Sequence, residues 1–336
     1  MNRCIWPLLC LLLLGCGKDL PLPPAKPLAL SSTAIDAMHG AAPGPYAVVA
    51  LRDLALATDS GDALAASLYF PQGDGGFPLL LFSHGNWSDR HSYDRVIEHW
   101  VSHGYVVLAA DHADCCSPVA GIFNSLRYGQ LGLIDRRVDD LNLLIDSVTG
   151  LESRFPQFRG KADLSNIAAT GHSFGAFSAQ QLGGASPLDP DSGQYNYQQD
   201  KRIRAVVALN PPGPMFDTIT AESWRGLKAP TLATTGTWDV QKGFWEDWRK
   251  HLMSFENSPA DNKYALVIEG ADHYLGNLIC RTQRDHPPQE DALRILQIVT
   301  TAFLDAQLKG DREASRTLEA GQLETRTNGF ARILQR

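Results

Sequence analysis

The sequence predicts an α/β fold in which helices cover both faces of a mostly parallel central sheet. Two observations lead to this class: short runs that are apolar on both faces, as buried parallel strands are, and helical segments that alternate with those runs. Strands that alternate with helices are joined by right-handed crossovers, which make neighbouring strands parallel. With 336 residues, 44% of them hydrophobic, the chain can bury the core of one large domain of this kind.

The expected elements follow one another along residues 46–310, which we predict to be the folded domain. Residues 46–70 are expected to form two strands around the turn at 59–62, where Asp and Gly cluster between alternating apolar residues. Further strands are expected at 77–85, 105–112, 166–171, 203–212, 230–239 and 264–273, and helices at 91–104, 135–148, 174–184 and 289–308.

Two polar segments have no clear periodicity. Residues 186–201 form a polar and aromatic insertion, which is either a lid or a surface loop. Residues 311–336 are expected to be a polar C-terminal tail that is partly disordered.

Residues 1–15 have the pattern of a secretory signal peptide, with a basic start, an apolar run and a small-residue exit. The apolar run, residues 5–14, is shorter than the ~20 residues of a membrane-spanning helix. The exit reads LLGC and resembles the lipobox of bacterial lipoproteins, which implies cleavage before Cys16 and lipid on that cysteine. We therefore expect a protein anchored to the bacterial cell envelope, with Gly17 favouring the outer membrane; the alternative is an ordinary secreted protein.

Residues 16–45 are rich in proline and are expected to form an extended tether between the lipid and the domain. Three cysteines lie beyond the tether, and an exported protein meets oxidising conditions. Because an odd number leaves one thiol free, we expect Cys280 to pair with Cys115 or Cys116. The alternative is three buried thiols.

Charge and motif content exclude several classes of function. The net charge is −7 and no basic stripe is present, so a nucleic-acid partner is not expected. The sequence has no metal-ligand spacing and no phosphate-binding loop, so no metal and no cofactor are expected. Nothing in it indicates a protein partner.

The sequence GHSFG at residues 171–175 carries the chemistry. It follows an apolar strand and precedes a helix rich in small residues, which is the context of a nucleophile elbow. The two glycines leave room for strand and helix to approach closely, and the helix N-terminus favours developing negative charge. We predict that Ser173 is a nucleophile; the alternative is an ordinary serine in a glycine-rich turn.

A serine hydroxyl needs a base to take its proton. In this architecture an acid and then a histidine follow the serine in chain order. Two successive predicted strands end at Asp239 and at His273. We therefore predict that His273 is the general base and that Asp239 orients it. Asp272 is an alternative acid, although neighbours on a strand point opposite ways, and Asp247 is a weaker one.

The negative oxygen formed during acyl transfer needs two backbone N–H donors. We predict Phe174, directly after the nucleophile, and Asn86, in the loop after strand 77–85. His84 and His172 flank these two motifs and are expected to support the site from beneath, whereas His112 could support or catalyse. Residues that could line an acyl pocket, or simply pack, are Trp87, Trp224, Trp238 and Tyr274.

The motifs SHG, SHGYVVLAADH, GHSFG, GTWD and GADH, spread over residues 77–308, together resemble the α/β-hydrolases. More narrowly, the chain resembles bacterial proteins related to platelet-activating-factor acetylhydrolases, predicted dienelactone hydrolases and cutinase-like polyester hydrolases. That resemblance implies hydrolysis of short or accessible esters through an acyl-serine. Two positions depart from the pattern: Ser173 stands where authentic dienelactone hydrolases have cysteine, and Ala176 where many relatives have glycine.

The sequence therefore predicts a serine carboxylesterase that acts on an ester substrate and is held at a membrane through Cys16. A lipase, amidase or peptidase would use the same three residues. A surface lipoprotein that only binds is the remaining alternative, because a fold alone does not establish activity.

Overall fold

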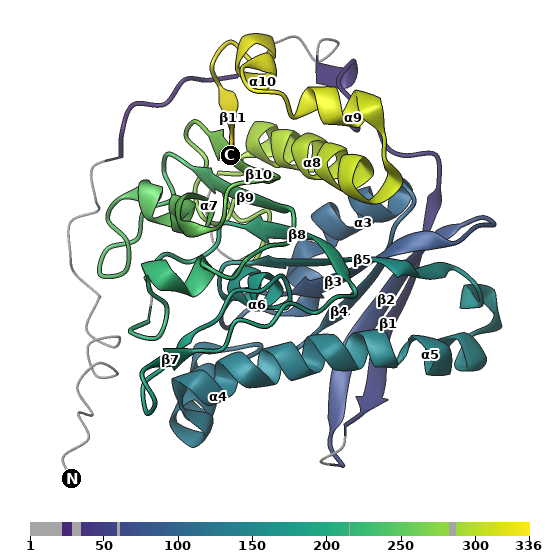
Figure 1. Cartoon of the computed structure of the whole chain (residues 1–336). Helices are drawn as coiled ribbons and strands as arrows, with labels where there is room; N and C mark the ends of the chain where they lie inside the picture. Colours follow the sequence, from purple (N-terminus) through teal and green to yellow (C-terminus); the bar gives the residue numbers. More distant parts are fainter. Residues whose placement is uncertain (1–21, 29–34, 59–60, 215, 282–286) are drawn as a thin grey trace.

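The computed structural model describes residues 22–28, 35–58, 61–214, 216–281 and 287–336 (Figure 1). The predicted signal peptide and Cys16 lie outside these residues. A nine-stranded sheet with the order β1-β2-β4-β3-β5-β8-β9-β10-β11 forms the centre of the molecule. Its strands are β1 (Ala47–Ala57), β2 (Ala63–Gln72), β3 (Phe77–Ser83), β4 (Val106–Ala110), β5 (Ala162–His172), β8 (Ile203–Leu209), β9 (Thr231–Gly236), β10 (Lys263–Ile268) and β11 (Ala331–Gln335).

The sheet is parallel from β4 across to β10 and antiparallel at both edges. β2 pairs antiparallel with β1 and with β4, and β11 pairs antiparallel with β10. β3 and β4 consist almost entirely of residues that are apolar on both faces, as buried parallel strands require, and the second half of β5 is buried as well. The predicted mostly parallel sheet is thus confirmed.

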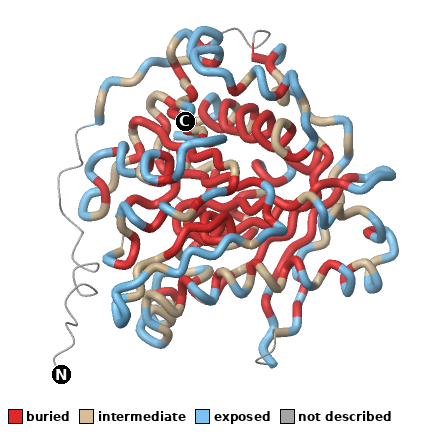
Figure 2. Tube along the Cα trace, viewed as in Figure 1, coloured by how far each residue is buried: buried red, intermediate tan, exposed pale blue. Residues whose placement is uncertain are grey.

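Helices cover both faces of the sheet (Figure 1). One face packs against α3 (Asp94–Ser102) and α8 (Glu290–Leu304) in one hydrophobic cluster. The other packs against α4 (Pro118–Asp146), α5 (Val148–Arg154) and α6 (Phe174–Leu182) in a second cluster. Figure 2 shows that the inner strands of the sheet and α8 are largely buried, while the edge strand β1 and the outer loops are more exposed.

Shorter elements connect these layers. They are the 3₁₀ helices η2 (Arg90–Tyr93), η3 (Pro156–Phe158), η4 (Ala221–Trp224) and η5 (Trp248–Leu252), the π-helix η6 (Asp305–Lys309), α7 (Met253–Asn257), α9 (Arg312–Thr317), α10 (Gln322–Arg326), β6 (Leu188–Asp189) and β7 (Gln194–Tyr195). No helix in the described ranges is long and apolar enough to cross a membrane.

The folded domain is larger than predicted at both ends. The expected polar tail forms α9, α10 and β11, and Phe330 and Ile333 are buried in the core. Before the expected start, Ile35 and Met38 are also buried there. The C-terminal segment is mostly polar and the N-terminal one is rich in proline, alanine and glycine, so their few core residues left no periodic pattern to read.

The insertion at 186–201 is a surface loop. It forms the β6–β7 hairpin, and its Tyr195 hydroxyl hydrogen-bonds the Thr220 hydroxyl at 2.6 Å. The segment beside the site is instead the first part of α4, which was not predicted as helix. Gly129, with a φ of 71°, interrupts that helix.

Candidate active site

The nucleophile position is a strained turn between β5 and α6. Ser173 has φ 52° and ψ −122°, a left-handed conformation that non-glycine residues rarely adopt. Its backbone N–H donates to the Leu209 carbonyl at 2.8 Å, which holds the turn in place. A side chain on Gly171 would collide with the backbone of Gly175, and one on Gly175 with the carbonyl of Ser83. The two glycines therefore allow α6 to begin directly against β3.

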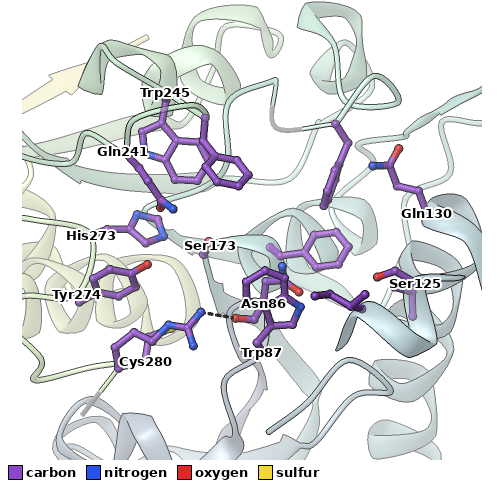
Figure 3. A pocket seen from close by; sticks show the side chains of 16 residues that line it. Asn86, Trp87, Ser125, Gln130, Ser173, Gln241, Trp245, His273, Tyr274 and Cys280 are labelled. Carbon is purple, nitrogen blue, oxygen red and sulfur yellow. Dashed lines mark hydrogen bonds between the residues drawn. The ribbon is translucent and has the colours of Figure 1, made fainter. Parts of the chain in front are cut away.

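An acid and a base come together after the next strands. His273 follows β10, Asp239 follows β9, and His273 Nδ1 lies 2.8 Å from Asp239 Oδ1. Because an ionised carboxylate only accepts, Nδ1 carries the proton and the lone pair of the neutral ring is at Nε2. His273 and Ser173 line the same pocket, as Figure 3 shows. Nε2 is therefore the nitrogen available to a serine hydroxyl.

The carboxylate of Asp239 is fully buried and accepts further hydrogen bonds. Asn210 Nδ2 donates to its Oδ2 at 2.6 Å, and the Thr235 hydroxyl does so at 3.3 Å. Burial opposes ionisation, but the charges of His251 and His273 and their hydrogen bonds outweigh it and hold the pKa of Asp239 well below its usual value. Asp239 thus stays ionised across the working pH range.

Sequence reasoning missed Asn210 and His251. Asn210 directly follows β8, so the rule that functional residues gather at strand ends could have found it. His251 lies in η5, a short 3₁₀ helix without a motif.

The alternative acids serve other purposes. Asp272 Oδ1 accepts the backbone N–H groups of Tyr274 at 2.8 Å and Gly276 at 3.0 Å, so it shapes the loop that carries His273. Asp247 caps η5 through the N–H of Arg249.

The loop after β3 brings Asn86, which we predicted as the second oxyanion donor, to the pocket. Asn86 lines the pocket, as does Phe174, the first residue of α6. Gly85 is required at the start of this loop, since a Cβ there would lie 2.9 Å from His172 Nδ1 and 3.1 Å from the Tyr93 hydroxyl.

A hydrogen-bond chain ties this loop to the loop of the base. The N–H of Gly85 donates to the Tyr93 hydroxyl at 2.9 Å, and that hydroxyl donates to His172 Nδ1 at 3.0 Å. His172 Nε2–H then donates to the carbonyl of His273 at 2.9 Å. Burial lowers the pKa of His172 well below its usual value, so the ring stays neutral. His172 thus supports the site from beneath, where it was expected.

His84 supports the same loop from the other side. Its Nδ1–H donates to the Gly85 carbonyl at 2.7 Å, and its Nε2 accepts the N–H of His112 at 2.9 Å. Burial and the nearby Arg137 cation lower the pKa of His84 well below its usual value. His112 bonds Asp140 at 2.8 Å and is not among the residues that line the pocket, so its role is also support.

The pocket is a cavity of about 190 Å³ whose wall is rich in aromatic side chains (Figure 3). Of the four residues predicted as possible pocket residues, Trp87 and Tyr274 line it. The other two predictions are wrong. Trp224 is completely buried behind α6, and the Trp238 indole N–H donates to the carbonyl of Pro23 at 2.7 Å, away from the pocket. Further lining residues are Ile122, Ser125, Gln130, Leu133, Phe216, Gln241, Phe244, Trp245 and Arg281.

The predicted disulfide is also wrong. Cys115 is bonded to its neighbour Cys116, and Cys280 is a free, buried thiol. Cys280 lies in the pocket wall against Tyr93, and burial raises the pKa of its thiol. The two cysteines that we considered as partners of Cys280 are thus bonded to each other in the loop after β4.

We assign no metal ligands. Two groups of suitable side chains lie close together in the described part of the chain, but the first includes the disulfide-bonded Cys115 and the second is the buried set around Asp239. The expectation of no metal and no cofactor stays a prediction.

Strand order places the chain in a class of proteins. β4 crosses over to lie between β2 and β3, and the strained serine stands at the end of the central strand β5. This is the α/β-hydrolase fold, whose nucleophile occupies that turn. By class, the chain is a serine hydrolase.

Comparison with known proteins leads to the same class. Residues 55–186, less than half of the chain, match a family model described as Chlorophyllase. Cutinase est2 of Thermobifida alba is 24% identical over 261 residues, which cover 77% of this chain and 72% of that protein. Cutinase est1 of the same organism is 23% identical over 264 residues, 78% of this chain and 75% of that protein. Platelet-activating factor acetylhydrolase of Canis lupus familiaris is 26% identical over 168 residues, 40% of this chain and 35% of that protein. The chain is thus a serine hydrolase with carboxylic-ester hydrolases among its relatives.

Proposed function

We propose that the chain hydrolyses carboxylic esters through an acyl-serine formed on Ser173. The main support is the contact of His273 Nδ1 with Asp239, which leaves Nε2 free in the pocket that Ser173 lines. The likeness to cutinases and to an acetylhydrolase favours esters over amides.

In the first half of the reaction, His273 Nε2 takes the proton of the Ser173 hydroxyl as the oxygen attacks the ester carbonyl carbon. The N–H groups of Asn86 and Phe174 stabilise the resulting oxyanion. When the intermediate collapses, the alcohol leaves with the proton held by His273. Water, activated by the same nitrogen, then attacks the acyl-serine and releases the acid.

The size of the pocket favours a compact acyl group. The chain without residues 1–21 is expected to hydrolyse p-nitrophenyl acetate and butyrate at least about tenfold more efficiently than the palmitate, since a cavity of about 190 Å³ lined by Trp87 and Phe244 leaves a long chain in water. The measurement is kcat/KM across this series in the presence of a fixed detergent concentration. A preference for palmitate would contradict a compact acyl site.

A lipase is the second candidate, and one observation favours it. Val119, Phe123 and Leu126 are 79%, 64% and 66% exposed on one face of α4, next to the pocket-lining Ile122 and Ser125. Apolar surface of this kind beside a pocket can contact a lipid phase. A jump in rate as tributyrin exceeds its solubility, lost in Phe123→Ser, would establish the lipase; a smooth saturation curve would establish the esterase.

Activity is expected to rise with pH in one step as His273 loses its proton. The base acts only when Nε2 is unprotonated, so turnover is absent below the step and full above it. Asp239 stays ionised through the step, because its pKa is held well below the usual value, and His84 and His172 stay neutral, because burial lowers theirs. The pH dependence of kcat/KM for p-nitrophenyl butyrate tests this. A second rising step, or none, would contradict the assignment of the base.

We also propose that the enzyme is held at the bacterial envelope by lipid on Cys16. The support is the signal-like pattern of residues 1–15 and the lipobox resemblance. Cys16→Ala is expected to move the protein from the membrane fraction to the soluble fraction, since the acyl chains provide the attachment. Detection of both forms by immunoblot after fractionation is the measurement. Equal membrane retention of the variant would contradict lipid anchoring.

A further inference from the structure

His251 lies completely buried against the carboxylate of Asp239, outside every motif of the sequence. Its Nδ1 is 2.7 Å from the carbonyl oxygen of Pro211, and its Nε2 is 2.9 Å from Asp239 Oδ1, although the ring does not point straight at that oxygen. The same Oδ1 accepts from His273 Nδ1. One carboxylate oxygen is therefore shared by two histidines.

The two neighbours of the His251 ring create a conflict for a neutral imidazole. A carbonyl oxygen and an ionised carboxylate only accept hydrogen bonds, and a neutral ring has a single N–H. If that proton is on Nδ1, where Pro211 requires it, the unprotonated Nε2 lies 2.9 Å from the negative oxygen of Asp239. In a buried site this repulsion is not screened by water. A second proton, on Nε2, turns the repulsion into a charge-assisted contact.

We propose that His251 carries protons on both ring nitrogens in the resting enzyme, and that this positioning residue holds Asp239 and lowers the basicity of His273. The inference rests on the proposed function of His273. The two histidine rings are 5.5 Å apart, so a positive charge on His251 opposes a second one on His273. His273 then releases its proton at a lower pH and is available as a base over a wider range.

The other groups around the ring fit this assignment. Asp239, from the loop after β9, supplies the compensating negative charge. His172, from the elbow, stays neutral because burial lowers its pKa. Trp245 packs its ring perpendicular to that of His251 at 4.8 Å, and so closes the site to water on that side.

The pH profile of kcat/KM for p-nitrophenyl butyrate distinguishes an effect of the His251 charge from an effect of the packing of its ring. His251→Phe removes both charge and hydrogen bonds, whereas His251→Gln keeps a neutral donor of similar reach. In both variants the rising step is expected to move to higher pH by about one unit, because His273 no longer meets a neighbouring positive charge. The matched control is Lys250→Gln, which removes an exposed charge one residue away and is expected to leave the step in place.

An unchanged step in variants that unfold cooperatively like the parent would overturn the proposal, since a packing role alone lowers stability without moving the step. If neither variant folds, ¹⁵N NMR of the histidine rings of the parent protein decides at neutral pH. Two protonated nitrogens on His251 are expected, and an Nε2 that carries no proton would overturn the proposal. This spectrum needs no turnover, so its outcome is independent of whether the protein proves to be an esterase.

Discussion

Ser173→Ala is expected to abolish ester hydrolysis, lowering kcat/KM by at least about 10⁴-fold, because the acyl-enzyme forms on the Ser173 hydroxyl. The fold is expected to stay intact, since the turn is fixed by backbone bonds and by the missing side chains of Gly171 and Gly175 rather than by the hydroxyl. Hydrolysis of p-nitrophenyl butyrate and the thermal unfolding temperature are measured together.

Ser125→Ala provides a matched control. Ser125 lines the same pocket, but its hydroxyl donates to the carbonyl of Gly121 within α4. We expect this variant to keep kcat/KM within about threefold of the parent. Equal losses in the two serine variants would indicate damage to the pocket rather than loss of a nucleophile.

Asp239→Asn is expected to lower kcat by about 10³–10⁴-fold with the pocket still formed. An amide in place of the carboxylate no longer stabilises the imidazolium of His273, and it can turn its NH₂ toward Nδ1 and force the wrong tautomer. The substitution also replaces the charge-assisted hydrogen bond that Asn210 donates at 2.6 Å with a neutral one, so some stability is lost. Steady-state kinetics above the pH step, with circular dichroism, measure both effects.

Asp272→Asn tests the competing assignment at the neighbouring position. Asp272 accepts two backbone N–H groups in the His273 loop, and an asparagine oxygen can accept them as well. A loss of no more than about threefold is expected. Should Asp272→Asn lose as much as Asp239→Asn, the acid would have to be reassigned.

Apolar continuity and glycine placement made most of the fold predictable. The strand at residues 77–85 and the helix after it were readable because a buried parallel strand is apolar on both faces and a surface helix is not. The elbow was readable because close approach of β3, β5 and α6 excludes side chains at Gly171 and Gly175, which leaves a pattern in the sequence.

The rest depends on contacts that leave no local pattern. Trp238 follows a strand end as a pocket residue would, but its indole meets Pro23, a partner more than two hundred positions away. The spacing of the three cysteines did not reveal that Cys116, which adopts a positive φ of 76°, bonds to its neighbour and leaves Cys280 without either partner. His251 reaches Asp239 only because η5 packs against β9, which no periodicity in a five-residue element reveals.

The central claim is that Ser173 becomes acylated during turnover. The most direct measurement is mass spectrometry of the peptide that contains Ser173 after the protein reacts with a p-nitrophenyl alkylphosphonate, a tetrahedral ester analogue that traps the nucleophile. We predict one adduct per chain, on Ser173, formed in step with the loss of esterase activity. Activity that persists in the fully modified protein, or inactivation with the adduct on another residue, would contradict the assignment.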